Sequence, residues 1–232
     1  MKKNILITGE PKSGKSTLLR KITEDIPNKI GFVTNEISEN NGRVGFEIET
    51  HSQQKKVLAH INFKTPHKVS RYFVDIQNLE SVVSEVSKFK NDDFLYLDEI
   101  GQMQLFSDQF KELVLKYLNS QNTCLATLSC VFEDDFTKSI KEREDIIIVE
   151  ISSENRNEKE KFLRQLIKKV GKAKGYISEP QRFNRKGSQV ELRSEHDIRI
   201  LSLTGSDWSC VCDFYKEYGI CSHAIAVQEV FK

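Results

Sequence analysis

The residues best suited to chemistry lie near the N-terminus, in an eight-residue run that fits a phosphate-binding P-loop. The run reads Gly9, Glu10, Pro11, Lys12, Ser13, Gly14, Lys15 and Ser16. Glycine, lysine and serine occupy every position that this motif fixes. The glycines let successive backbone N–H groups turn toward an anion, and the start of a following helix adds a positive dipole end. We therefore predict that residues 9–17, with Thr17 as the last, bind the phosphates of a nucleotide.

Two side chains of this loop have specific expected roles. Lys15 is expected to reach the β- and γ-phosphates and to act in catalysis, and the Ser16 hydroxyl is expected to ligate magnesium. The alternative is a glycine turn that only caps a helix. A strand-like run at 4–8 and a helical pattern at 15–25 flank the motif, and this context favours phosphate binding.

A second candidate site lies where an apolar run at 94–97 meets Asp98 and Glu99. We expect Asp98 to hold magnesium through a water molecule, and Glu99 to orient or deprotonate an attacking water. A strand that ends in a solvated turn would look similar, but the P-loop favours the catalytic interpretation. The second carboxylate favours hydrolysis of the nucleotide. Two alternatives stay open: a kinase acting on a nucleotide or polynucleotide, and a nucleotide-gated binding module with little turnover.

Four metal-ligating side chains gather near the C-terminus, in the order Cys210, Cys212, Cys221 and His223. Residues two apart in an extended chain share a face, so the first two cysteines can offer their sulfurs to one ion. Three thiolates and an imidazole suit a closed tetrahedral zinc site with a structural role. A buried apolar cysteine cluster and a disulfide are the alternatives. The two remaining cysteines, at 124 and 130, are expected in the core.

The elements around these residues alternate between strand-like and helix-like patterns. Strands are predicted at 4–8, 29–35, 43–50, 55–62, 93–97, 123–129 and 146–151. Helices are predicted at 15–25, 79–89, 109–118, 136–143 and 157–170. This order predicts an α/β fold with a mostly parallel sheet between helices. We expect a nucleotide-binding domain at 1–170, a linker at 171–175, and a small module at 176–232 with strands at 189–193 and 198–203 and a helix from about 224.

Composition limits the broad class of the protein. A hydrophobic share of 38% with 14 Phe among 232 residues supports a folded core rather than global disorder. The net charge of +1 gives no global electrostatic argument for nucleic-acid binding. No apolar run is long enough to span a membrane and no signal peptide is recognisable, so we expect a cytoplasmic protein without membrane association.

Further blocks accompany the P-loop, at 31–37, 42–46, 98–107, 125–127, 140–145 and 155–156. Together they resemble the nucleoside-triphosphatases first described from thermophiles and found in animals as the cancer-related nucleoside-triphosphatase. The resemblance covers about residues 3–168. It implies a RecA-like P-loop fold, magnesium-dependent hydrolysis of ATP, GTP and other nucleoside triphosphates with little base preference, and a position near the nucleotide for residues 95–102.

The same resemblance has consequences for single residues. Arg143 falls on a family arginine, which we expect to be a catalytic charge facing phosphate; a surface ion pair is the alternative. Lys12 stands where the family usually has glycine, and Ser129 and Cys130 replace its usual proline. Neither departure removes a group that holds phosphate or magnesium.

The C-terminal ligand pattern resembles the SWIM zinc finger, which has Cys-x-Cys, a variable spacer and Cys-x-His. Residues 187–192 and 198–203 match the two strands of that module, and Trp208 precedes the metal ligands. The resemblance implies a ββα module that binds DNA, RNA or protein. A basic cluster at 168–174, with Arg182, Arg185 and Lys186, offers contacts to nucleic acid or is simply a solvated face.

Overall fold

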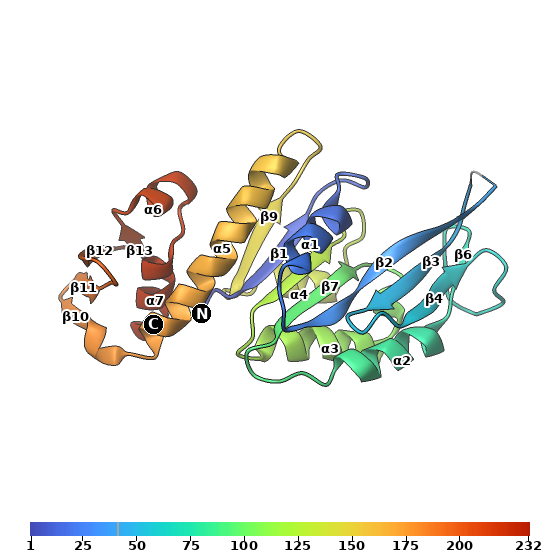
Figure 1. Cartoon of the computed structure of the whole chain (residues 1–232), viewed down its shortest axis with the longest axis horizontal. Helices are drawn as coiled ribbons and strands as arrows, with labels where there is room; N and C mark the ends of the chain where they lie inside the picture. The colour runs from blue at the N-terminus through green and yellow to red at the C-terminus, as the bar shows by residue number, and fades with distance from the viewer. Residues whose placement is uncertain (41) are drawn as a thin grey trace. The chain divides into compact units, whose positions relative to one another are not determined.

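The chain forms two compact units in a computed structural model that describes residues 1–40 and 42–232 (Figure 1). The nucleotide-loop unit is Asn4–Glu160, and the C-terminal unit joins Met1–Lys3 to Lys161–Lys232. Within the described residues, no helix has the length and apolar character needed to cross a bilayer.

One half of the sheet in the nucleotide-loop unit is parallel. Its neighbouring strands, in spatial order, are β2 (Lys29–Glu39), β7 (Phe94–Ile100), β8 (Cys124–Leu128), β1 (Asn4–Thr8) and β9 (Ile146–Glu150). The strands β1, β7 and β8 read as short apolar runs because both of their faces are covered. Their carboxyl ends lie along one edge of the sheet, which is where ligands of open α/β sheets bind.

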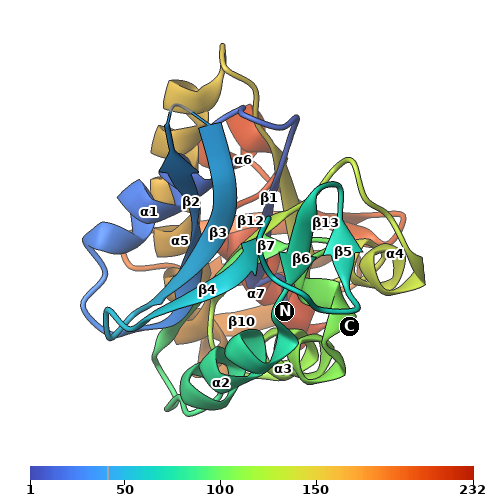
Figure 2. The same ribbon diagram turned by 90° about the vertical axis from the view of Figure 1, so that its right-hand side faces the viewer.

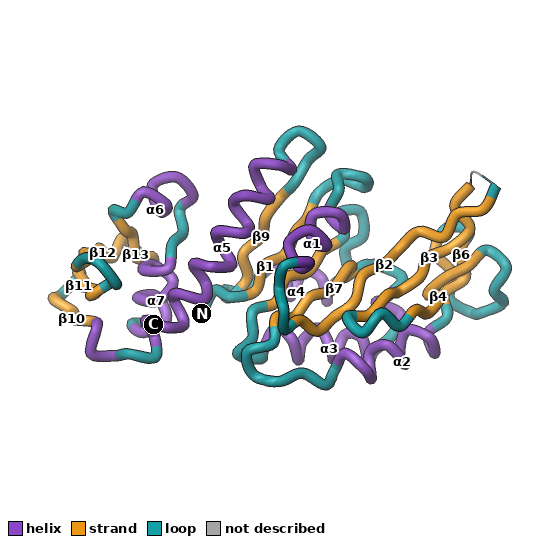
Figure 3. Tube along the Cα trace, in the orientation of Figure 1, coloured by secondary structure: helices purple, strands orange, loops and turns teal. Residues whose placement is uncertain are grey.

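The other half of the sheet is antiparallel. From β2 it continues through β3 (Gly42–Thr50), β4 (Lys55–His60), β6 (Tyr72–Val74) and β5 (Lys68–Val69). The predicted hairpin at 43–50 and 55–62 is confirmed as β3 and β4. Figure 3 shows how far the β2–β3 ribbon extends beyond the parallel strands.

Helices cover both faces of this sheet. They are α1 (Lys15–Glu24), α2 (Ile76–Val86), α3 (Asp108–Asn119) and α4 (Asp135–Lys141), with the 3-10 turn η1 (Gln104–Phe106) before α3. Leu6 packs in one buried cluster with residues of α2 and α3, which lie side by side (Figure 2). Alternation along the strand turns Ile5 and Ile7 to the other face, where Leu18 and Leu19 of α1 are fully buried.

The helices begin where side chains can cap their free N–H groups. Asp75 accepts from the Asn78 amide ahead of α2 at 3.0 Å, and Ser107 accepts from the Phe110 amide ahead of α3 at 3.2 Å. A cap of this kind contributes about 1 kcal/mol. Helix α1 is different, because its N-cap is Gly14, which has no side chain.

The C-terminal unit contains a separate four-stranded antiparallel sheet. Its strands are β10 (Phe183–Lys186), β11 (Gln189–Arg193), β12 (Ile198–Thr204) and β13 (Asp207–Cys210), and its short helices are η2 (Pro180–Arg182), α6 (Asp213–Tyr218) and α7 (Ser222–Val230). The expected ββα module is therefore incomplete. The prediction missed β10 and β13, because these strands are too short and too mixed in polarity to show the alternation typical of a strand.

The linker expected at 171–175 is a second correction. These residues belong to helix α5 (Arg156–Ile177), which runs through both glycines without a break. Val170, Ala173 and Tyr176 are buried at helical spacing, and burial of this stripe outweighs a cost of about 1 kcal/mol for each glycine.

Candidate active site and metal centre

The predicted nucleotide loop connects β1 to α1 and depends on its two glycines. Gly9 has a φ of +147°, and a Cβ atom there would lie 2.2 Å from the carbonyl oxygen of Ile151. Gly14 has a φ of +93° and forms the N-cap of α1. Lys12, which replaces a family glycine, has a φ of +67°. The loop thus keeps a glycine-like conformation at Lys12, at a cost of about 1–2 kcal/mol.

The loop leaves hydrogen-bond donors without a side-chain cap at the start of α1. Such N–H groups, together with the helix dipole, form an anion site. The Lys15 ammonium lies over the same loop and donates to the carbonyl oxygens of Gly9 at 2.7 Å and Glu10 at 3.1 Å. The buried Ser13 hydroxyl has no hydrogen-bond partner among the described residues. These groups fit a bound triphosphate.

The predicted magnesium ligands lie together. The Ser16 hydroxyl donates to Oδ1 of Asp98 at 2.9 Å, although 82 residues separate them. Asp98 is 1% exposed. Burial raises the pKa of this carboxyl group, and hydrogen bonds from Thr127, Ser16 and the Thr34 amide oppose that rise. A hydroxyl and a carboxylate at this spacing form the oxygen set that magnesium prefers, so the residues fit this ion.

Glu99 lies beside this pair on β7 and is the predicted water-activating residue. Burial and the neighbouring Asp98 raise the pKa of its carboxyl group, and Lys15 lowers it. Gly101 leaves the room that the carboxylate occupies, because a Cβ atom there would lie 2.6 Å from Oε1 of Glu99. A carboxylate with a raised pKa is a stronger base toward water.

Three residues near the loop were missed by the sequence analysis. Thr127 on β8 donates to Oδ1 of Asp98 at 2.6 Å, and the Thr34 hydroxyl on β2 donates to the Asp98 carbonyl oxygen. Cys130 is exposed rather than in the core, and its thiol lies 3.0 Å from the carbonyl oxygen of Gly9. Thr34 and Thr127 fall in the family-like blocks at 31–37 and 125–127, but it is the strand order that brings them to Asp98.

Arg143 is not brought to the nucleotide loop, and this position argues against the catalytic role predicted for it. It precedes β9, whose first residue Ile146 pairs with Asn4 at the start of β1, whereas the P-loop follows the end of β1. A strand of this length separates the two edges by about 15 Å. The Arg143 guanidinium instead forms two hydrogen bonds of 2.9 Å with the Asp145 carboxylate. The ion-pair alternative therefore holds.

This assignment makes a prediction for Arg143→Ala. We expect nucleotide turnover to stay within about twofold of the parent, and the free energy of unfolding to fall by about 1 kcal/mol, since the pair is charged, bidentate and partly buried. Denaturant titration and phosphate release measure the two effects. Arg143→Lys is the matched control, because lysine keeps the positive charge but cannot form the two parallel hydrogen bonds of the guanidinium group. A hundredfold loss of turnover with unchanged stability would show instead that Arg143 acts in catalysis.

The four predicted zinc ligands converge in the C-terminal unit. Cys210 ends β13, Cys212 and Cys221 are the N-caps of α6 and α7, and His223 lies in the first turn of α7. Their ligand atoms all lie within 4.8 Å of one another. Nδ1 of His223 is 3.7 Å from Sγ of Cys210 and 3.8 Å from Sγ of Cys221.

These separations fit a metal centre. In a tetrahedral zinc site, bonds of about 2.3 Å to sulfur and 2.1 Å to nitrogen place those atoms about 3.6 Å apart. Hydrogen bonding with Cys221, followed by His223, lowers the pKa of the Cys210 thiol, and the thiolate is the form that binds zinc. The Cys210, Cys212, Cys221 and His223 cluster therefore has the spacing and the chemistry for a zinc ion.

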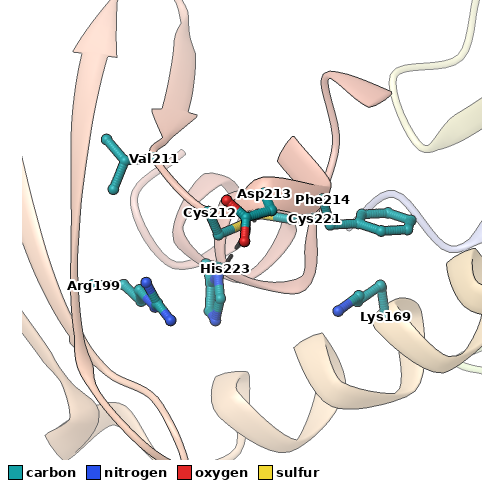
Figure 4. A pocket seen from close by; sticks show the side chains of 8 residues that line it. All are labelled: Lys169, Arg199, Val211, Cys212, Asp213, Phe214, Cys221 and His223. Atoms are coloured by element: carbon teal, nitrogen blue, oxygen red, sulfur yellow. Dashed lines mark hydrogen bonds between the residues drawn. The ribbon is translucent and has the colours of Figure 1, made fainter. Parts of the chain in front are cut away.

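A pocket of about 270 Å³ adjoins this cluster. Figure 4 shows Lys169 and Arg199 at its sides, and Cys212, Cys221 and His223 at its centre. The Lys169 ammonium also lies 4.9 Å from the centre of the Phe214 ring. The Asp213 carboxylate lines the same pocket, and Arg199 also pairs with Asp197 at 2.8 Å, so the pocket has charges of both signs.

Known proteins similar to this chain match the nucleotide-loop unit. The profile of the NTPase family matches residues 4–163. "Nucleoside-triphosphatase THEP1" of Thermotoga sp. strain RQ2 is 37% identical over 155 residues, or 66% of this chain and 88% of that protein. The human "Cancer-related nucleoside-triphosphatase" is 27% identical over 175 residues, covering 68% of this chain and 92% of the human protein.

Solved structures agree with the expected α/β P-loop fold. The crystal structure of THEP1 from Aquifex aeolicus superposes with a TM-score of 0.61 at 31% identity, over 71% of this chain and 98% of that one. The solution structure of the human protein gives 0.60 at 25% identity, over 71% and 97%. With the P-loop, the acidic strand and these matches together, the chain belongs to the NTPase family of nucleoside-triphosphatases.

Proposed function

We propose that this protein hydrolyses nucleoside 5'-triphosphates to diphosphate and phosphate with magnesium, and that its C-terminal unit holds a structural zinc ion and recruits a partner. One observation carries the enzymatic part. The Ser16 hydroxyl donates to the buried Asp98 carboxylate at 2.9 Å, and Glu99 follows directly in the chain. The phosphate loop, the Ser16 and Asp98 pair proposed for magnesium, and the half-buried Glu99 carboxylate therefore lie at one edge of the sheet.

Each residue of the candidate active site has a separate role in the proposed hydrolysis. Residues 9–17 hold the phosphates, and the Lys15 ammonium neutralises the charge that develops on them. Ser16 would bind magnesium directly and Asp98 through water, and the ion would supply charge stabilisation at the phosphates. Glu99 orients a water molecule and takes its proton, and burial strengthens it as a base.

Low base preference follows from where the loop makes its contacts. A P-loop binds phosphates through backbone N–H groups and a lysine, and these groups do not contact the base. We therefore expect ATP, GTP and other triphosphates to serve as substrates. The half-buried Glu99 carboxylate beside Ser16 and Asp98 favours water as the acceptor, because a kinase needs space there for its acceptor molecule.

The test is a phosphate-release assay with purified protein. We expect comparable release from ATP, GTP, CTP and UTP, loss of release when magnesium is omitted, and recovery when it is added back. The same assay with single- or double-stranded nucleic acid probes a link to a partner. No release, with label appearing on an added acceptor, would point to a kinase. Tight nucleotide binding without release would point to a gated binding module.

The zinc proposal rests on the convergence of four soft ligands from β13, α6 and α7. This ligand order is similar to that of the SWIM zinc finger, whose members bind DNA or protein. A small unit gains most from a metal that joins its sheet to its helices. Lys169, which lines the pocket beside the ligands, is the group that would contact an anionic partner, either a phosphate of nucleic acid or an acidic side chain of a protein.

A further inference from the structure

An arginine with no hydrogen-bond or ion-pair partner among the described residues lies against the nucleotide loop. Arg156 is the first residue of α5. A Cβ atom placed on Gly14 would lie 2.6 Å from Nη1 of Arg156 and 2.8 Å from its Cδ. The side chain, including one end of the guanidinium group, therefore packs on the backbone of the last loop glycine. This is the glycine that begins α1 and its anion-binding N–H groups.

The segment that carries Arg156 is fixed to the loop by its backbone. The Ile151 amide donates to the carbonyl oxygen of Thr8 at 2.8 Å. One residue later, the Ser152 amide donates to Oδ1 of Asn155 at 2.9 Å, and the Asn155 amide donates to the Ser152 hydroxyl at 3.3 Å. The turn that precedes Arg156 is therefore closed by its own side chains.

The charge of Arg156 has no paired counter-charge in the part of the chain that the structure describes. Among the described residues, its guanidinium forms no hydrogen bond and no ion pair. Arg143, by contrast, is held by Asp145, and Arg20 donates to Asn35. A guanidinium beside a phosphate-binding loop has the planar fork that matches phosphate oxygens.

Strand order determines which end of a nucleotide Arg156 would meet. The strands run β7, β8, β1, β9 across the sheet. Asp98 and Glu99 on β7 lie on one side of the P-loop strand β1, and Arg156 follows β9 on the other side. Metal ligands and a water-activating residue mark the γ-phosphate end. Arg156 therefore lies toward the nucleoside end of the phosphate chain.

We propose that Arg156 binds the α- and β-phosphates of the nucleotide from the nucleoside side of the P-loop. The orientation rests on the proposed roles of Asp98 and Glu99 in hydrolysis. Because these two phosphates are present in both substrate and product, Arg156 contributes equally to the binding of NTP and NDP. It adds binding energy that is uniform between ground state and transition state, and such energy changes KM without changing kcat.

The experiment measures equilibrium binding of ATP, ADP and tripolyphosphate to Arg156→Ala by calorimetry, together with kcat and KM for phosphate release. We expect the Kd of all three ligands to rise by about tenfold to a hundredfold, with kcat at saturation within about threefold of the parent. Arg156→Lys should recover part of the affinity, and Arg156→Gln should behave like the alanine variant. Lys161→Ala, which removes an exposed cation farther along α5, should change nothing.

Three results would overturn the proposal. The first is unchanged affinity for ADP and ATP. The second is a fall in kcat with normal ADP affinity, which would place Arg156 at the γ-phosphate. The third is weaker ATP binding with normal tripolyphosphate binding, which would place it on the base. Because binding is measured without turnover, an absence of hydrolysis in the parent protein would contradict the proposed function and leave this binding test intact.

Discussion

Replacing Glu99 by Gln is expected to lower kcat for phosphate release by about a hundredfold to ten-thousandfold, the range that general base catalysis contributes. Glutamine keeps the size of the side chain and most of its hydrogen bonding but cannot take a proton from water. Nucleotide affinity should stay within a few-fold of the parent, because the P-loop holds the phosphates. Burial and Asp98 raise the pKa of the Glu99 carboxyl group, so a neutral amide is also easier to accommodate there.

Two further variants separate catalysis from binding in this experiment. Lys15→Ala removes the ammonium that lies over the loop and should lose both turnover and affinity. Glu112→Gln, at an exposed site on α3, should retain both. Phosphate release and calorimetry give the two readouts. If Glu99→Gln hydrolyses at the parental rate, the water-activating group lies elsewhere.

Loss of the metal ligands should have the largest effect on stability. We expect about one zinc ion per chain in the parent protein by elemental analysis. The double variant Cys210→Ser with Cys212→Ser should contain none. Structural zinc contributes on the order of 10 kcal/mol in small domains, so the C-terminal unit should lose its fold and its resistance to protease.

The control for this experiment is Cys130→Ser, which changes an exposed cysteine outside the metal cluster and should leave the zinc content unchanged. Limited proteolysis should then cleave the double variant within Lys161–Lys232 and leave the control intact. Carefully reduced parent protein without zinc would contradict the metal assignment. A folded C-terminal unit without the metal would show that the zinc ion is not structural.

Local patterns were enough to predict the parallel half of the fold and to single out the residues that lie together at the candidate active site. A buried parallel strand is a continuous apolar run, so β1, β7, β8 and β9 were recognisable. The P-loop was recognisable because its glycine, lysine and serine residues follow one another at fixed spacings along the chain. The acidic pair was found because its strand and its chemistry are adjacent in sequence. The expected meeting of Ser16 with Asp98 is seen in the structure as a direct hydrogen bond.

The features that the sequence could not predict depend on the order of the strands in the sheet. They also depend on the balance between the low helix propensity of glycine and the burial of apolar side chains. Thr127 and Arg156 lie near the nucleotide loop because β8 and β9 flank β1. Both fall in blocks that resemble the family, but those blocks assign neither residue a role. Arg143 had the charge expected of a catalytic residue, but it lies at the opposite edge of the sheet, where Asp145 binds it. The glycines at 171 and 175 suggested a linker, but burial of the apolar face of α5 stabilises the helix by more than the two glycines destabilise it.

The hydrogen bond between Ser16 and Asp98 would determine how the site receives the proposed magnesium ion. A hydroxyl has one proton and two lone pairs. Because the Ser16 proton is directed to Oδ1 of Asp98, both lone pairs of the hydroxyl are left for a cation. Thr127 donates to the same oxygen and restrains the carboxylate. The ligand is thus preorganised, and the reorganisation that metal entry would otherwise require is already complete in the folded protein.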